Sequence, residues 1–132
     1  MNLLPYLSFA EQLFADVRAL TFDGVGITRE SYGRGESATG EFLRELALAH
    51  GLEVCVDRAA NLVFSDAGVS LDTPAIWIGS HIDSVPQGGN FDGLAGVVAG
   101  LLILIARRRA GNAGGAPIRT IAFRGEESAW FG

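Results

Sequence analysis

The chain has 132 residues, which is enough for one domain and no more, because domains most often contain about 100 to 150 residues. Of these residues 48% are hydrophobic and 19% are charged, which excludes the low-hydrophobicity, high-charge class of disordered chains. The net charge of −5 argues against nucleic acid or anionic lipid as a partner, since their phosphates attract basic proteins.

The sequence shows no sign of export or of a membrane span. Cys55 is the only cysteine, so no internal disulfide can form. The beginning of the chain, MNLLPYLSFAEQ, lacks the positive region and the cleavage site of a signal peptide. The longest stretch of apolar residues and glycines, from Leu94 to Ala106, is shorter than the about 20 residues that cross a bilayer. We expect a cytoplasmic protein without a membrane partner.

The first expected element is a helix over residues 9–20. Ser8 and Glu11 form a capping box at its start. Apolar residues then recur at helical spacing, namely Phe9, Leu13, Val17 and Leu20. The helix is therefore expected to pack with one face against the rest of the domain.

A loop, a second helix and a hairpin are expected next. Residues 23–37 are rich in glycine, serine and charge and predict the loop. Four apolar residues mark the helix, which ends at Gly51: Phe42, Leu43, Leu46 and Ala49. His50 lies in its last turn, where an imidazole favours the helix dipole, and we assign it no function. The segments LEVCVD and LVFS, joined by RAAN, predict a β-hairpin.

The second half of the chain predicts a strand, a helix and a strand. PAIWIGS is a continuous apolar run typical of a strand buried on both faces, and IRTIAF is expected to be another buried strand. The helix between them is expected from Asp92 to Arg109, with Gly96 and Gly100 on the face that packs on the sheet. Such a crossover joins parallel strands, so the fold class is α/β with a parallel βαβ core.

Five ionisable residues are expected at one edge of this unit. His81 and Asp83 end the first strand, Asp92 begins the helix, and Glu126 and Glu127 follow the second strand. Ligands of open α/β sheets bind beyond the carboxyl ends of the strands. Four carboxylates would repel one another there unless a cation neutralised them, so the pattern predicts a divalent metal site with Asp92 as its central residue.

Each of these residues also has an ordinary structural interpretation. Asp92 could be an ordinary helix N-cap, a lone histidine after a strand is usually structural, and Glu126 and Glu127 could be an exposed acidic pair. The glycines from Gly79 to Gly93 do not form a phosphate loop, because neither the dinucleotide pattern nor the Gly-Lys-Ser/Thr pattern occurs. Together the five residues favour the metal site.

Two segments, GSHIDSVPQGGNFDGLAGV and AFRGEES, resemble the hydantoinase/carbamoylase-type amidases of the aminoacylase and carboxypeptidase superfamily. Three features of these segments match the family motif. They are His-x-Asp, an aspartate eleven residues after the histidine, and a Glu-Glu pair whose second member follows that aspartate by thirty-five residues. GITRESY and VDRAANLV look like further segments of the family, so the resemblance covers nearly all of the chain.

The resemblance implies a binuclear hydrolase of linear amides such as N-carbamoyl-amino acids, allantoate or related ureido compounds. His81 would bind one metal ion, Asp92 would bridge both ions, and Glu127 would bind the second. Asp83 would hold His81, and Glu126 would be the general base for the attacking water. The two ions would be zinc, with manganese or cobalt as alternatives.

The resemblance also implies that more chain belongs to the active protein. Members have two further histidine ligands and a lid or dimerisation domain, and Trp130 stands where an arginine is common. Residues 1–132 would thus be the N-terminal portion of a three-layer α/β/α catalytic domain, inactive alone, from a homodimer that acts on a small-molecule substrate. The alternatives are a non-catalytic structural or interaction module, and a peptidase or N-acyl-amino acid deacylase of the same superfamily.

Overall fold

The structure is a computed structural model that describes residues 4–111 and 114–131. In chain order its elements are α1 (Leu4–Thr21), α2 (Arg34–Ala49), β1 (Leu52–Val56), β2 (Leu62–Asp66), β3 (Ile76–His81), α3 (Leu94–Arg109), β4 (Ile118–Phe123) and a 3-10 turn (Ser128–Trp130). The predicted α/β fold is confirmed, and so are the hairpin β1–β2 and the strand–helix–strand unit β3–α3–β4.

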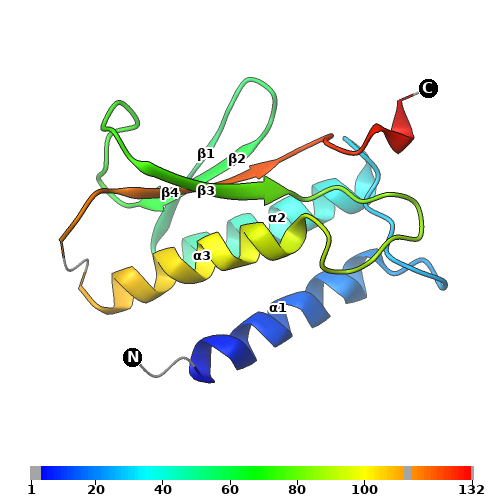
Figure 1. The fold of residues 1–132 in the computed structure, drawn as a ribbon, viewed down its shortest axis with the longest axis horizontal. Helices are drawn as coiled ribbons and strands as arrows, with labels where there is room; N and C mark the ends of the chain where they lie inside the picture. The colour runs from blue at the N-terminus through cyan, green and yellow to red at the C-terminus, as the bar shows by residue number, and fades with distance from the viewer. Residues whose placement is uncertain (1–3, 112–113, 132) are drawn as a thin grey trace.

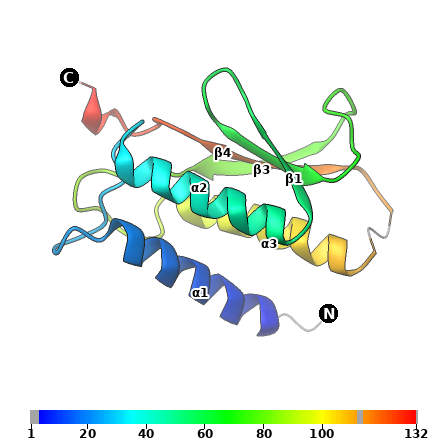
Figure 2. The same cartoon turned by 180° about the vertical axis from the view of Figure 1, so that it is seen from behind.

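The four strands form one mixed sheet in the order β1-β2-β4-β3. β1 and β2 pair antiparallel, β2 and β4 pair antiparallel, and β4 pairs parallel with β3 through the crossover helix α3. Figure 1 shows all three helices on one side of the sheet, with α1 farther from it than α3, and Figure 2 shows α2 beside α3 from behind. Within the described residues, the three-layer arrangement implied by the resemblance is thus represented by the sheet and one helical layer.

The hydrophobic core lies between the sheet and this helical layer. The strands β2 and β4 contribute Phe64 and Ala122, and the helix α3 contributes a continuous apolar face. The buried residues of that face are Leu94, Val97, Val98, Leu101, Leu104 and Ile105. Because α3 packs against β3 and β4, the core fixes the position of the amino-terminal end of α3, where the candidate site lies.

The helix α3 lies very close to the sheet at two glycines, as the sequence predicts. A Cβ atom on Gly100 would be 2.5 Å from Oγ1 of Thr120, and one on Gly96 would be 2.7 Å from Cβ of Ser80. Real Cβ atoms do not approach other atoms so closely, so no larger residue fits at either position unless its neighbour moves. These two glycines let α3 approach the strands that carry the candidate site.

The prediction that PAIWIGS is buried on both faces is wrong. Ile76 and Trp77 of β3 are 55% and 51% exposed. β3 is an edge strand in the described part of the chain, paired on one side only, and the helices cover one face of it. β4 takes the central place instead, where Thr120 and Ala122 are fully buried.

The starts of the three helices also differ from the prediction, that of α3 by only two residues, since it begins at Leu94 and not at Asp92. α1 begins at Leu4, so Ser8 lies inside the helix and Pro5 occupies its first turn, where a missing N–H costs nothing. Leu20 at its other end is 51% exposed and does not join the core. α2 begins at Arg34, within the expected loop, because the Glu30 carboxylate accepts hydrogen bonds from the first backbone N–H groups of the helix. No helix in the described ranges has the length and apolar character needed to cross a membrane.

Candidate metal centre

The carboxyl ends of β3 and β4 point the same way and reach the edge of the sheet where α3 begins (Figure 1). His81 is the last residue of β3, and Asp83 follows it. Asp92 precedes α3, and Glu126 and Glu127 follow β4. The parallel crossover therefore brings all five predicted residues to one edge.

The ligand atoms at this edge are close to one another. The His81 Nε2 atom lies 3.7 Å from Oε2 of Glu126 and 3.9 Å from Oδ1 of Asp92. His81, Glu126 and Glu127 each offer one ligand atom within 4.8 Å of the others. Asp92 and Glu126 are largely solvent-exposed, whereas the His81 side chain is only 13% exposed. The cluster is thus open on its acidic side and buried on its histidine side.

The hydrogen bonding of His81 determines which ring nitrogen is free. Its Nδ1 atom lies 3.1 Å from the backbone oxygen of Asp83 and 3.2 Å from Oδ1 of the same residue. Both neighbours are acceptors, so they favour a proton on Nδ1, and the corresponding neutral tautomer has its lone pair on Nε2. Asp83 therefore orients the His81 ring with Nε2 toward Asp92 and Glu126.

Asp83 is fully buried and held by other parts of the chain. Its Oδ2 accepts hydrogen bonds from the Ser31 hydroxyl at 2.6 Å and from the Glu127 backbone N–H at 2.8 Å. Burial acts to raise the pKa of Asp83, but the hydrogen bonds from Ser31 and from the Glu127 and Glu126 backbones, together with His81, outweigh it and lower this pKa below its usual value. Asp83 is therefore a buried carboxylate that links β3 to the segment after β4.

The lowered pKa of Asp83 predicts a pH-dependent contribution to stability. A carboxyl whose pKa is lower in the folded state stabilises the fold fully above its unfolded pKa of about 3.9 and loses that effect as the pH falls through the folded value. We expect Asp83→Asn to lower the free energy of unfolding by about 2 kcal/mol at pH 7, because charged hydrogen bonds are lost. The difference should shrink as the pH falls below 4, measured by urea unfolding.

Asp72→Asn is the matched control, since Asp72 is an exposed aspartate in the loop between β2 and β3. It should leave stability nearly unchanged throughout the same pH range. A difference between Asp83→Asn and the unsubstituted protein that stayed constant down to pH 3 would contradict this role of the Asp83 carboxylate.

The structure adds two residues that the sequence did not single out: Ser31 contacts Asp83, and Arg29 lies fully buried behind the β3 end. Trp130, noted in the sequence for its place in the family pattern, donates from Nε1 to the Ser84 backbone oxygen at 2.7 Å. Arg29 and Ser31 belong to the GITRESY segment, which the family resemblance already marks. Their place depends on packing between segments more than fifty residues apart, which no local pattern reveals.

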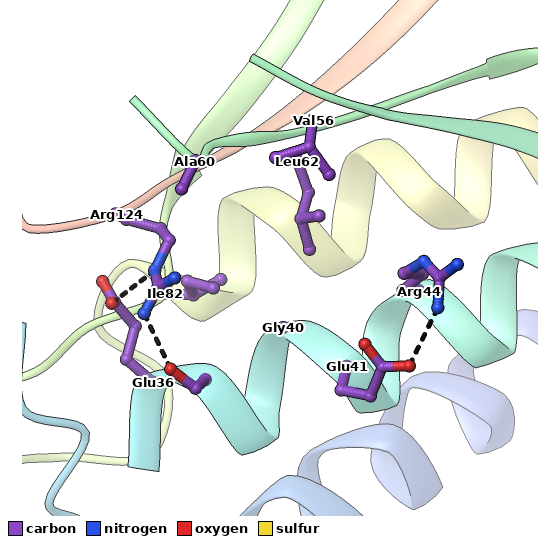
Figure 3. A pocket seen from close by; sticks show the side chains of 10 residues that line it. Glu36, Gly40, Glu41, Arg44, Val56, Ala60, Leu62, Ile82 and Arg124 are labelled. Carbon is purple, nitrogen blue, oxygen red and sulfur yellow. Dashed lines mark hydrogen bonds and ion pairs between the residues drawn. The ribbon is translucent and has the colours of Figure 1, made fainter. Parts of the chain in front are cut away.

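The turn after β4 is held by an ion pair with α2. Arg124 donates from Nε to Oε2 of Glu36 at 2.6 Å (Figure 3). The Gly125 N–H donates to Oε1 of Glu36 at 2.8 Å. Tyr32 N–H also donates to this fully buried carboxylate. Glu36 thus determines how the chain leaves β4 on its way to Glu126.

A hollow of about 440 Å³ lies between α2 and the β1–β2 hairpin (Figure 3). It shares Ile82 and Arg124 with the segments that carry the cluster, but none of the five predicted residues lines it. His50 is likewise away from the cluster, at the opposite end of α2 from Glu36, with its ring 5.4 Å from that of Phe9. Burial lowers the pKa of His50, and the nearby Arg109 lowers it further.

The donor set fits a divalent cation. Two atoms that each lie about 2.1 Å from one ion are at most about 4.2 Å apart, so the two distances from His81 Nε2 are within reach of a shared ion. Both distances are too long for hydrogen bonds, and a free imidazole lone pair beside carboxylates is the donor chemistry that zinc prefers. Both glutamates belong to the group, so the division of roles between them stays a prediction.

The chain is similar in sequence to hydrolases of known activity. An N-carbamoyl-L-amino acid amidohydrolase of Geobacillus stearothermophilus is 36% identical over 106 residues, 80% of this chain and 26% of that protein. The corresponding enzyme of Paenarthrobacter aurescens is 36% identical over 125 residues, 92% of this chain and 30% of its own. A ureidoglycolate hydrolase of Arabidopsis thaliana is 29% identical over 106 residues. The chain spans about a quarter to a third of the first two relatives.

Solved structures agree with this similarity. A hydantoinase/carbamoylase family amidase of Burkholderia vietnamiensis matches 93% of this chain with a TM-score of 0.81 and 28% identity, and the match covers 31% of that amidase. A second such amidase, of Burkholderia ambifaria, matches 91% of this chain with a TM-score of 0.76 and 27% identity. No protein-family model matches the chain. The predicted resemblance is confirmed in sequence and in fold.

Proposed function

This chain is a relative of the hydantoinase/carbamoylase family amidases in sequence and in fold, and on that premise we propose that its protein is a metal-dependent hydrolase of linear amide C–N bonds. The proposed substrate is an N-carbamoyl-amino acid, allantoate or a related ureido compound. The activities of the relatives, N-carbamoyl-L-amino acid and ureidoglycolate hydrolysis, support this substrate class.

One observation carries the proposal, namely the meeting of His81 Nε2 with Asp92 and Glu126 at the edge of the sheet. His81 would bind one ion, Asp92 would bridge two ions, and Glu127 would bind the second. When bound, the ions, zinc with manganese or cobalt as alternatives, supply positive charge that polarises the substrate carbonyl. They also neutralise carboxylates that would otherwise repel one another.

The residues themselves perform the proton transfer. The Glu126 side chain is 60% exposed, so it can meet a water molecule and a substrate at the open side of the cluster. It takes a proton from the water as the new C–O bond forms, and returns this proton to the nitrogen as the C–N bond breaks. Asp83 keeps the Nδ1 proton of His81 in place, so Nε2 stays free as a ligand.

The proposal also concerns the 132 residues alone. His81, Asp92 and Glu127 give each ion two protein ligands, counting the shared Asp92 twice, whereas catalytic zinc commonly has three. We therefore expect the 132-residue chain to bind zinc weakly and to show no turnover. A cytoplasmic homodimer without nucleic acid or membrane partners is part of the same proposal, and the net charge of −5 supports the absence of nucleic acid.

The test compares the 132-residue chain with the longest form of the protein that carries it. Both are assayed for ammonia or amino acid release from N-carbamoyl-amino acids, allantoate and a dipeptide, with added zinc, manganese or cobalt, and zinc is counted by equilibrium dialysis. The longer form should hydrolyse a ureido substrate and the short chain should not. Turnover of the dipeptide alone would favour a peptidase, and no metal binding by either form would contradict the proposal.

A further inference from the structure

Arg29 is a fully buried arginine in the loop between α1 and α2. Arginine is almost never fully buried unless its guanidinium is paired. Here it lies beneath the end of β3 and the start of α3, and its role is not explained by the core, which is apolar. The hydrogen bonds of its side chain identify the segments that it connects.

The Arg29 side chain connects two backbone positions of the candidate centre. Its Nε donates to the Ile82 backbone oxygen at 2.6 Å, and its Nη2 donates to the Asp92 backbone oxygen at 3.2 Å. Ile82 lies between His81 and Asp83, so the two acceptors belong to the two ends of the predicted ligand segment. One planar guanidinium therefore fixes the distance between them.

The Arg29 backbone adds two further contacts to the same segment. Its N–H donates to the Ser84 hydroxyl at 2.9 Å, and its carbonyl accepts from the Ser84 N–H at 2.9 Å. The loop from Ser84 to Asp92 contains Gly88 and Gly89 and has no helix or strand of its own. Glycine-rich backbone loses the most conformational entropy when it is ordered, so a fixed spacing across this loop needs an external tie.

The positive charge of Arg29 is opposite to that of the neighbouring carboxylates of the centre. Burial lowers the pKa of Arg29, while the carboxylates of Asp83 and Asp92 act in the opposite direction. Within the described residues Nη1 is buried and has no hydrogen-bond partner, so the guanidinium depends on these neighbouring charges. The cation and the acidic cluster thus stabilise each other.

We propose that Arg29 is a positioning residue that sets the spacing of His81 and Asp92 for the metal ion. The inference rests on the proposed function for the identity of the ligand, but the positions of the two residues are a property of the chain without metal. Residues that orient metal ligands change metal affinity by about 10- to 100-fold when they are lost.

The experiment uses the two histidines of the chain, His50 and His81, as separate probes. Histidine-labelled protein is studied by NMR without metal and then during a zinc titration. In Arg29→Met, which removes the guanidinium, we expect the His81 ring signals to shift before any zinc is added, and zinc affinity at His81 to fall by at least about 10-fold. The His50 signals, from the far end of α2, should not change.

Arg119→Met is the matched control. Arg119 is 2% exposed and also donates to two backbone oxygens, those of Ser70 and Thr73, but it lies in the amino-terminal half of β4, away from His81. It should lower stability and leave both zinc affinity and the His81 signals unchanged. Equal losses of zinc affinity in the two variants would mean that Arg29 acts only through overall stability.

If Arg29→Met does not fold, Arg29→Lys tests the positioning role of Arg29 instead. Lysine keeps the charge but lacks the planar fork that reaches both oxygens, so zinc affinity should again fall and the His81 signals should again shift. Unchanged affinity and unchanged His81 signals in a folded Arg29→Lys would overturn the inference. If the 132-residue chain binds zinc at His81 too weakly to titrate, the metal-free His81 signals still decide the positioning role, and the proposed function is decided separately by metal binding and turnover of the longer form.

Discussion

Glu126→Gln is expected to lower turnover by about 10² to 10⁴-fold in the active, full-length protein while the bound metal is retained. An amide has the size of the carboxylate but cannot accept a proton from water. The Glu126 side chain is exposed at the open side of the cluster, so the substitution should leave the fold unchanged. Turnover of the ureido substrate and metal content, measured on the same preparation, test this expectation.

Glu127→Gln is the matched comparison, because the two glutamates are adjacent and both belong to the three-residue group around His81. A neutral amide is a weaker ligand, so Glu127→Gln should lose metal first and activity as a result. Added zinc should restore part of the activity of Glu127→Gln and none of that of Glu126→Gln. The reverse pattern would show that the two glutamates have exchanged roles.

Glu36→Ala is expected to lower the free energy of unfolding by about 3 to 5 kcal/mol. Its fully buried carboxylate accepts hydrogen bonds from Arg124 and from the backbones of Tyr32 and Gly125, and all three donors would lose their partner. Donors that lose their acceptor in a largely buried position are costly, and the Arg124 guanidinium, whose side chain is 18% exposed, would keep only its hydrogen bond to the Ser37 hydroxyl. Chemical unfolding followed by circular dichroism measures the effect.

Glu41→Ala on the same helix is the control. Glu41 pairs with Arg44 at 2.9 Å, but both side chains are about half exposed, and such surface pairs contribute about 1 kcal/mol or less (Figure 3). The comparison therefore separates burial from charge pairing. A loss below 1 kcal/mol in Glu36→Ala would contradict the importance given to this carboxylate.

The sequence predicts most of the elements and the edge at which the site lies. The strand–helix–strand order is enough for the latter, because a parallel crossover places both carboxyl ends and the helix start together. His81 and Glu126 therefore meet as expected. Metal binding and the separate roles of Asp92, Glu126 and Glu127 stay predictions, since the positions of these side chains alone do not define which of them binds an ion and which accepts a proton.

What the sequence does not predict depends on contacts between distant segments. The apolar run of β3 fits a buried strand and an edge strand equally well, and only the strand order β1-β2-β4-β3 decides between them. The start of α2 depends on the Glu30 side chain, and no capping pattern of the usual kind precedes it. Arg29 and Ser31 lie in what reads as a polar loop, and their burial follows from their contacts with Ile82 and Asp83.

The contacts behind the candidate centre also bear on the order in which the chain folds. Arg29 and Asp92 are 63 residues apart, Glu36 and Arg124 are 88 apart, and Ser31 and Glu127 are 96 apart. Closing such long loops costs chain entropy that local helices and the β1–β2 hairpin do not face. We therefore expect the centre to be assembled after these local elements have formed, so that a nascent or partly folded chain carries His81, Asp92 and Glu126 before they are brought together.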